Sequence, residues 1–288
     1  MIEIREVKTK KEQKAFIEFP LKLYKDSPYF VPPLYADEKA IFKKNYVYYE
    51  TAKAVYYLAY RDKKLVGRIS GIISFGGNER WKENRVRFTR FDAINDQEVA
   101  NALFDAVEKW GKANGMDILC GPLGFSDLER EGLLIEGFDE LSTFEEQYNY
   151  SYYQSLIENC GLVKEVDWEE RKIYPSDCFD ARLEKLTESI LKKYNLHIPK
   201  CKNINDFLNR YADQFFELYE QAYDELYQTV PLTNGIKKML MANFKLLLTL
   251  DYISVVVDEN NKVVCLGLVL PSLSKAVQKS GGRLIYLL

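Results

Sequence analysis

The stretch that decides the fold runs from Arg85 to Cys120 and reads RVRFTRFDAINDQEVANALFDAVEKWGKANGMDILC. Residues 85–91 alternate apolar and polar side chains, which is typical of a half-buried strand. A capping box at Asn95 and Glu98 predicts the start of an amphipathic helix. Residues 116–120 form a short apolar run that indicates a buried strand. A strand–helix–strand unit of this kind predicts two parallel strands joined by a right-handed crossover.

The residues before this stretch predict one strand, a helical region and a hairpin. Residues 2–7 alternate as a strand, and a capping box at Thr9 and Glu12 opens a helix. Two further alternating runs, residues 54–60 and 65–75, are separated by a polar turn and predict an antiparallel hairpin.

The residues after this stretch complete the first half. We expect a long irregular segment from Gly121, a helix over residues 152–159 that Gly161 ends, and a last strand over residues 162–173. The predicted fold class is α/β (α+β), with a mixed central sheet flanked by helices.

The second half of the chain repeats the opening order of the first. A linker helix is expected first, then a strand, two helices and a hairpin, and the chain stops on an apolar run. This order predicts a duplicated domain whose second copy is truncated, with residues 1–178 as the first domain and residues 179–288 as the second. The expected elements of the second half are residues 182–193, 196–201, 206–227, 233–248, 252–257 with 263–270, and 284–288.

Composition excludes several classes of function. The chain has 288 residues and a net charge of −3, with acids and bases interspersed, so no basic surface for nucleic acid is expected. Five cysteines without a CxxC pair, together with the single histidine His197, predict no metal site and no Ser–His–Asp triad. No signal peptide or apolar run long enough to cross a bilayer is present, so we expect a cytoplasmic protein without a membrane partner.

The most unusual segment is Gly121 to Asp139, which is rich in glycine and carboxylates. It follows a buried parallel strand, at the end of the sheet where open α/β folds place ligands. Its carboxylates are suited to an amine substrate, and Glu131 is the candidate that takes a proton from an attacking amine. The alternative is a surface Ω-loop held by its own turns. The candidate pocket residues are Gly121, Pro122, Ser126, Asp127 and, from the following helix, Tyr152.

The order of elements resembles that of the GNAT superfamily of acyl-CoA N-acyltransferases. Several motifs of the first domain also resemble an uncharacterised bacterial family of GNAT-like proteins, whose members usually extend past the point where this chain stops. These motifs are Phe19-Pro20-Leu21 through Tyr24, Tyr29 to Leu34, Gly67-Arg68-Ile69, Asn95 to Ala100, Gly121-Pro122, Gly132-Leu133-Leu134, Glu136 to Asp139 and Asn149 to Gly161.

The resemblance implies a co-substrate, which is acetyl-CoA or another acyl-CoA, and an amine acceptor. In the family, a bulged strand pairs with the pantetheine arm, and a glycine-rich loop binds the pyrophosphate at the start of the central helix. Residues 91–98 depart from that pattern, because they contain no glycine and present Asp92, Asp96 and Glu98. Like charge opposes phosphate binding, so no cofactor-binding residue is assigned.

The family also uses a tyrosine of the late helix as a general acid toward the thiolate. Ile157 occupies that position here, and Tyr152 and Tyr153 lie nearly two turns earlier. Tyr153 is the catalytic candidate by this resemblance. The alternative is that both tyrosines pack the start of the helix.

Three functions follow as hypotheses. The first is an acyl-CoA-dependent N-acyltransferase that acts on an unknown amine. The alternative is a catalytically degenerate GNAT-type binding or assembly module, which the acidic loop and the displaced tyrosine favour. A Fem-type aminoacyl transferase also pairs two such domains, but it requires a basic surface for tRNA that the composition does not supply.

Overall fold

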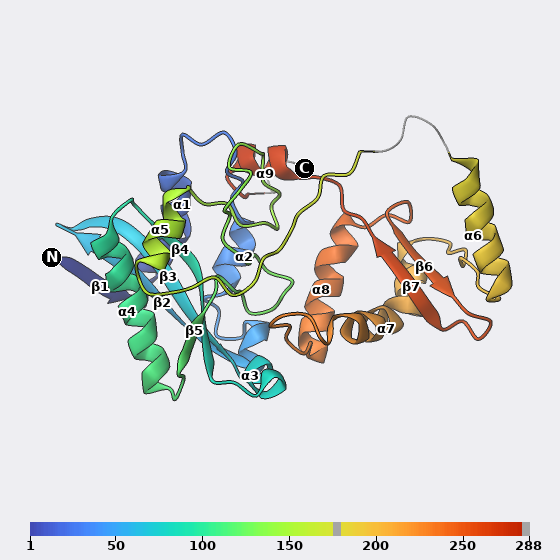
Figure 1. The fold of residues 1–288 in the computed structure, drawn as a ribbon, viewed down its shortest axis with the longest axis horizontal. Coiled ribbons are helices and arrows are strands. Elements are labelled where there is room, and N and C mark those ends of the chain that lie inside the picture. Colours follow the sequence, from blue (N-terminus) through green and yellow to red (C-terminus); the bar gives the residue numbers. More distant parts are fainter. Residues whose placement is uncertain (175–179, 284–288) are drawn as a thin grey trace. The chain divides into compact units, whose positions relative to one another are not determined.

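The computed structural model describes residues 1–174 and 180–283, apart from the side chains of residues 244, 246 and 247. The chain divides into two compact units (Figure 1). The first unit comprises Met1–Asp167, Gln228–Pro231 and the residues from Ser272 onward, and the second comprises Trp168–Tyr227 and Leu232–Pro271. The predicted boundary between residues 178 and 179 stays a prediction.

The first unit contains a five-stranded sheet with the order β1-β2-β3-β4-β5. All neighbouring strands are antiparallel except β4 and β5, which pair in parallel from Arg85 with Ile118 to Arg87 with Cys120. The predicted parallel pair is therefore confirmed, as is the mixed sheet flanked by helices. The elements are β1 (Ile2–Glu6), α1 (Lys10–Leu23), α2 (Tyr35–Ala40), the 3₁₀ turn η1 (Val47–Glu50), β2 (Ala52–Arg61), β3 (Lys64–Ser74), α3 (Phe75–Trp81), β4 (Arg85–Ala93), α4 (Gln97–Ala113), β5 (Ile118–Cys120), α5 (Tyr152–Glu158) and α9 (Ser274–Ser280).

Local capping explains where the two long helices of this unit begin. The predicted box of α1 is present, with the Glu12 amide 3.2 Å from Thr9 Oγ1 and the Thr9 amide 2.8 Å from Glu12 Oε2. The box predicted at Asn95 for α4 is wrong by one residue, because the Asp96 carboxylate accepts the Glu98 amide at 3.0 Å. A carboxylate caps as well as an amide and also interacts favourably with the helix dipole.

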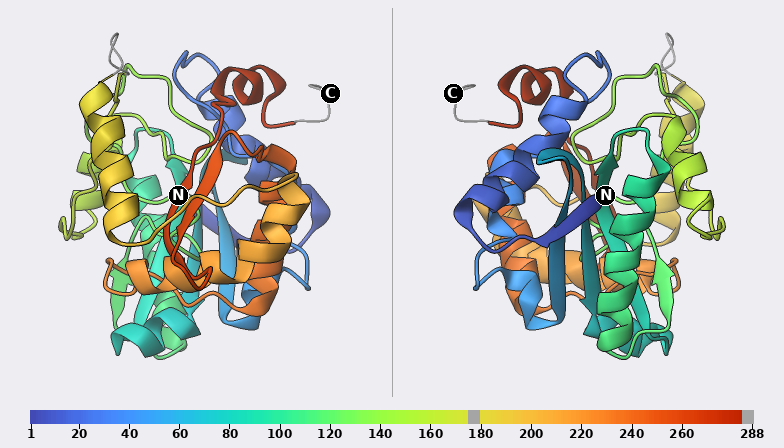
Figure 2. Two further views of the ribbon diagram at one scale, coloured as in Figure 1. Left: turned by 90° about the vertical axis from the view of Figure 1, so that its right-hand side faces the viewer. Right: turned by 90° about the vertical axis from the view of Figure 1, so that its left-hand side faces the viewer.

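Helix α4 and helix α1 cover opposite faces of the sheet (Figure 2). The buried face of α4 contacts β3 closely, because Gly67 leaves room for Val99 and Leu103. A Cβ atom at Gly67 would lie 2.9 Å from Leu103 Cδ1 and 3.0 Å from Val99 Cγ1. On the other face, the buried ring of Phe16 in α1 lies under the guanidinium of Arg68. Close packing of α4 on the sheet therefore depends on a small residue at this position of a central strand.

The strand predicted over residues 162–173 is wrong. These residues are irregular in the structure, and Val163 and Ile173 are 88% and 87% exposed. An alternating pattern forms a strand only where a sheet edge can accept it, and β5 spans just three residues. The helix predicted over residues 152–159 is confirmed as α5.

In the second unit, the described residues form three helices and one hairpin. Helix α7 packs Phe207 and Tyr211 against Val255 and Val257 of β6, as the apolar helical pattern predicts. The strand predicted over residues 196–201 is wrong, because only His197 bridges to Val257, with both amide–carbonyl distances at 2.9 Å. The elements are α6 (Ala181–Lys193), α7 (Ile204–Tyr223), α8 (Asn234–Leu247), β6 (Ile253–Val257) and β7 (Val263–Leu268).

The predicted hairpin of this unit is confirmed, and helices precede it as in the first unit. The run at residues 284–288, expected to begin a further strand, lies outside the described residues. The truncated second copy therefore stays a prediction. Within the described part of the chain, no helix is both long enough and apolar enough to cross a membrane.

Candidate active site

The loop that follows β5 is fastened to β4 and to itself. The Leu123 amide donates to the Phe88 carbonyl at 2.9 Å, and the Gly132 amide donates to the Pro122 carbonyl at 2.8 Å. Gly121 has a φ of +142°, and a Cβ atom there would collide with the Phe88 carbonyl oxygen. Glycine is required at this point because the chain turns out of the sheet against another backbone. The predicted segment is thus an ordered loop.

Two of the predicted pocket residues form hydrogen bonds within the protein. Ser126 is fully buried, and its hydroxyl lies 2.9 Å from the hydroxyl of Tyr48 and accepts the Leu128 amide at 3.3 Å. Asp127 is half-buried and accepts the Val230 amide at 3.5 Å. These hydrogen bonds fix the conformation of the loop. They therefore also fix the positions of its carboxylates.

Among the carboxylates of this loop, Glu131 has an environment suited to proton transfer. Its side chain is half-buried, and its carboxylate accepts no hydrogen bond from the residues that the structure describes. Burial and then the Asp127 carboxylate raise the pKa of Glu131 to about 7, while Arg87 acts in the opposite direction. A carboxylate with a pKa near neutral pH is matched to general acid–base work.

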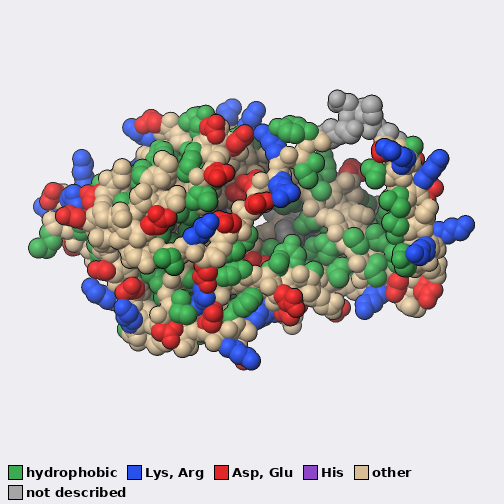
Figure 3. Space-filling model, in the orientation of Figure 1, with side chains coloured by type: hydrophobic (Ala, Val, Ile, Leu, Met, Phe, Trp, Pro, Cys, Tyr) green, Lys and Arg blue, Asp and Glu red, His purple; other side chains and the backbone are tan. Residues whose placement is uncertain are grey.

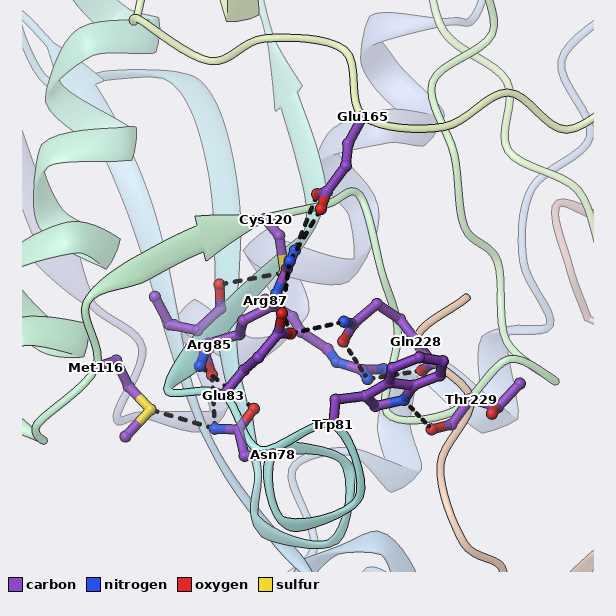
Figure 4. A network of polar contacts seen from close by, with 11 residues as sticks. Asn78, Trp81, Glu83, Arg85, Arg87, Met116, Cys120, Glu165, Gln228 and Thr229 are labelled. Atoms are coloured by element: carbon purple, nitrogen blue, oxygen red, sulfur yellow. Dashed lines mark hydrogen bonds and ion pairs between the residues drawn. The ribbon is translucent and has the colours of Figure 1, made fainter. Parts of the chain in front are cut away.

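The Arg87 side chain is held by a segment that lies far away in the sequence. Arg87 is 1% exposed, and its Nη2 donates to the Gln228 carbonyl at 2.7 Å (Figure 4). The Gln228 side chain in turn donates to Glu83 at 3.0 Å, and the Trp81 indole donates to the Thr229 carbonyl at 3.0 Å. Residues 228–231 therefore cover Arg87, the cation that lowers the pKa of Glu131. Sequence reasoning missed them, because a four-residue segment carries no periodic signal.

Arg85 forms a second branch of the same network (Figure 4). Its guanidinium binds the Glu165 carboxylate through two contacts of 2.9 Å and also pairs with Glu83. Hydrogen bonds to Glu165 foremost, and to Glu83, raise the pKa of Arg85 despite partial burial. The guanidinium therefore stays charged and fixes the irregular chain after α5 to the sheet.

Tyr153 is buried at the end of β4. Its hydroxyl accepts the Ala93 amide at 3.1 Å and lies 2.7 Å from the Tyr24 hydroxyl and 3.3 Å from Asp92 Oδ1. Burial, and then the Asp92 charge, raise the pKa of Tyr153 well above its ordinary value. A phenol with so high a pKa is a poor proton donor at neutral pH.

Tyr152 binds the same residue of β4, because its hydroxyl donates to the Ala93 carbonyl at 2.8 Å. The two tyrosines therefore fasten α5 to the sheet, as the packing alternative predicts. The described structure contains no hydrogen bond between Glu131 and either tyrosine. The catalytic role of Tyr153 stays a prediction.

Strand β4 carries the bulge that the GNAT resemblance implies. Arg68 pairs with Asp92 and Ser70 pairs with Thr89, so β4 has one residue more than β3 between these pairs. Arg90 lies in the bulge with a φ of +50°, a conformation that is unusual for a long side chain. The bulge turns the Arg90 side chain toward Glu38 at 2.9 Å.

A buried ionic network surrounds this bulge. Arg68 donates to Asp92 at 2.8 Å and lies 3.4 Å from Glu38, and all three side chains are nearly inaccessible. Burial alone would raise the pKa of Glu38, but Arg90 and Arg68 outweigh it and hold that pKa below its ordinary value. The network rigidifies the strand end that the resemblance associates with the co-substrate.

The acidic start of α4 is less repulsive than the sequence suggests. Asp92 is paired internally with Arg68, and Arg61 lies 2.7 Å from both Asp96 and Glu98. No residue set is assigned to the pyrophosphate. Among the described residues, no group of His, Cys, Asp and Glu side chains is arranged to hold a metal ion, and Cys120, Cys160, Cys201 and Cys265 are free thiols. Cys178 lies outside the described residues.

Comparisons with known proteins give two curated relatives, and no protein-family model matches the chain. The chain is 28% identical to protein YghO of Escherichia coli strain K12 over 98% of its own length and 71% of that protein. It is 32% identical to the bacterial ceramide synthase of Caulobacter vibrioides strain NA1000 / CB15N over 56% of its own length and 42% of that protein.

Three solved structures give weak overlaps. A tandem GNAT protein from the clavulanic acid biosynthesis pathway has a TM-score of 0.48 and 11% identity, over 92% of this chain and 73% of its own. A predicted acetyltransferase from Clostridium acetobutylicum with acetyl-CoA has a TM-score of 0.39 and 11% identity, over 60% of this chain and 96% of its own. An aminoglycoside acetyltransferase from an uncultured soil metagenomic sample, in complex with sisomicin, has a TM-score of 0.37 and 10% identity, over 60% and 97%.

Proposed function

We propose that this chain belongs to an acyl-CoA-dependent N-acyltransferase in which Glu131 is the general base. The observation that carries the proposal is the position and environment of Glu131. It is a half-buried carboxylate with a pKa of about 7, in the ordered loop after the parallel strand β5. Ligands of open α/β sheets bind at this end of the strands.

The chemistry requires a base because a primary amine is protonated at neutral pH. Glu131 would accept one proton from the ammonium group, and the neutral nitrogen then attacks the thioester carbonyl carbon. The C–N bond forms and the C–S bond breaks. A second proton passes from the nitrogen to the departing thiolate, and Glu131 releases its proton to solvent. Beyond the effect of burial, Asp127 raises the pKa of Glu131 and Arg87 lowers it. The fixed positions of these two side chains therefore help to determine how strong a base Glu131 is.

The acceptor class is proposed from a relative. Ceramide is the amide of a long-chain amine with a fatty acid, and the Caulobacter protein named ceramide synthase matches just over half of this chain. We therefore propose a long-chain primary amine as the acceptor and an acyl-CoA as the donor.

One observation favours the alternative, a binding module without turnover. The amide and carbonyl groups of Ala93, at the end of the bulged strand, are taken by Tyr153 and Tyr152. A strand edge that is satisfied by its own side chains is less available to a co-substrate. The following experiment separates the two functions.

The test is turnover by the full chain with a matrix of acyl-CoA donors, from acetyl to palmitoyl, and amines that include a long-chain base. Free CoA thiol and the amide product are both measured. We expect Glu131→Gln to lower kcat/KM at least 100-fold and to remove the acidic limb of the pH profile near 7. The matched control is Glu136→Gln, which changes an exposed carboxylate of the same loop.

Tyr153→Phe completes the set, because it keeps the ring and removes the hydroxyl. If Tyr153 only fastens α5, kcat changes little at a temperature where the variant is folded. Absence of turnover with every donor and acceptor, together with acyl-CoA binding, would support the binding module instead.

A further inference from the structure

A cavity of about 510 Å³ lies within the second unit, between the chain after His197 and strand β6. Its inner wall is apolar and buried, because Phe207, Ile253 and Val255 are only 3%, 7% and 1% exposed. This volume is in the range of pockets that bind small molecules. The rest of the lining includes Ile198, Lys200, Cys201, Asp251, Tyr252, Ser254, Gly267 and Val269.

The mouth of the cavity is apolar as well, although it faces solvent. Ile198, Tyr252 and Val269 are 55%, 45% and 60% exposed, and all three line the cavity. Figure 3 shows hydrophobic side chains gathered over the β6–β7 hairpin of this unit. Large apolar side chains that are exposed beside a buried apolar wall mark a binding site more than a solvated surface.

The cavity begins where a backbone pairing ends. His197 and Val257 exchange both backbone hydrogen bonds, and beyond this bridge Ile198 and Val255 both line the cavity. Apolar side chains from both segments favour an apolar ligand between them.

The charges of the site lie away from its inner wall. Lys200 and Asp251 line the cavity, whereas the buried wall contains no ionisable side chain. Burial raises the pKa of the Cys201 thiol, which also lines the cavity. A ligand that matches this distribution has an uncharged apolar body and a polar head group that stays outside.

We propose that this cavity binds the alkyl chain of a lipid-like ligand, with the head group beside Lys200 and Asp251. The inference goes beyond the proposed function, because the cavity belongs to the unit that does not contain Glu131. Binding is measurable even if the chain performs no acyl transfer, so the two proposals can fail separately.

The test is calorimetric titration of the full chain with fatty acids and alkylamines of eight to fourteen carbons, below their micelle concentrations. We expect affinity to rise by about fourfold per added methylene while the chain still enters the cavity, and then to level off. Gly267→Phe should lower affinity at least tenfold. A Cβ atom at Gly267 would meet no heavy atom within 4 Å, so the ring can enter the cavity without a clash.

The matched control is Val264→Phe, which adds a ring on the same strand at an exposed position that does not line the cavity. Ser254→Phe is a second blocking variant, because Ser254 pairs with Gly267 across the hairpin and also lines the cavity. Thermal unfolding of each variant verifies that it is folded.

The head group is identified by two further variants. Lys200→Gln weakens binding of the fatty acid if the ligand is an acyl chain, and Asp251→Asn weakens binding of the alkylamine if it is a long-chain amine. Affinity that does not depend on chain length, or full binding by both blocking variants, would overturn the proposal. A dimer in sedimentation that no ligand dissociates would also overturn it, because a second copy would then fill the cavity.

Discussion

The two units differ most in what they bury. Every buried polar or charged side chain that the structure describes belongs to the first unit, including Arg68, Arg87 and Asp92. The buried side chains of the second unit are apolar, such as Phe207 and Val255. A buried network needs partners from several elements at once, and only the first unit has a five-stranded sheet to supply them.

The two hairpins show the same difference. The β2–β3 hairpin is flanked by β1 and by β4, whereas the described residues add to β6–β7 a single bridge at His197. An isolated hairpin with helices on one face leaves its other face in solvent. The second unit therefore keeps apolar residues exposed, and the first unit uses its extra strands to enclose charges.

The largest effect is expected where the first unit buries charge. Arg68→Met leaves Asp92 without its guanidinium partner and removes one of the two that neutralise Glu38. We expect a loss of about 3–5 kcal/mol in the free energy of unfolding, measured by urea denaturation. Lys112→Met is the control, because Lys112 forms an exposed pair with Glu108 and should cost no more than about 0.5 kcal/mol. Equal losses in the two variants would show that the buried network does not stabilise the unit.

An intermediate effect is expected from two glycines, one in each unit. Gly121→Ala should cost about 2 kcal/mol, because its φ of +142° and the Phe88 carbonyl oppose a side chain. Gly267→Ala should be neutral or stabilising by up to about 1 kcal/mol, because nothing lies near its Cβ position. Differential scanning calorimetry of both variants measures the contrast. A stabilising Gly121→Ala would mean that the chain leaves β5 by a different path.

Local sequence patterns correctly predicted the helices and strands whose formation depends on neighbouring residues. Alternation and helical periodicity placed β4, α4 and β5 and gave their parallel pairing. Alternation alone misassigned residues 162–173, because a strand also needs a sheet edge of matching length. Alternation indicated that residues 85–91 form a strand, but it did not show what covers their polar side chains. The structure buries Arg87 there under residues 228–231.

The sequence predicted which loop carries the candidate site. It did not predict the burial and the neighbouring charges of the residues in that loop. Glu131 was chosen because its loop follows a parallel strand. Its raised pKa depends on burial and on Asp127 and Arg87, which no local pattern reveals. The contacts of Tyr153 with Tyr24 and Asp92 join three distant parts of the sequence and were likewise not visible in it.

The smallest effect is the pH dependence that Glu131 gives to the stability of the first unit. The pKa of Glu131 is raised from 4.5 to about 7 in the folded chain. A carboxyl group whose pKa is raised by folding favours the folded state below its unfolded pKa, and that contribution is lost as the pH rises through the folded pKa. Wild-type stability should therefore fall between about pH 4.5 and 7 relative to Glu131→Gln, whose side chain resembles the protonated acid.

The expected difference is about 1 kcal/mol, because solvent screens a half-buried carboxylate. Melting temperatures of both proteins at pH 5 and pH 8 measure it. Glu145, whose pKa burial also raises to about 7, keeps a similar dependence in the variant, so only the difference between the proteins reports on Glu131. Glu136→Gln should follow the wild type at both pH values, because Glu136 is exposed. A wild type that gains stability relative to Glu131→Gln as the pH rises would place Glu131 beside a cation strong enough to outweigh its burial, and would remove it as the base.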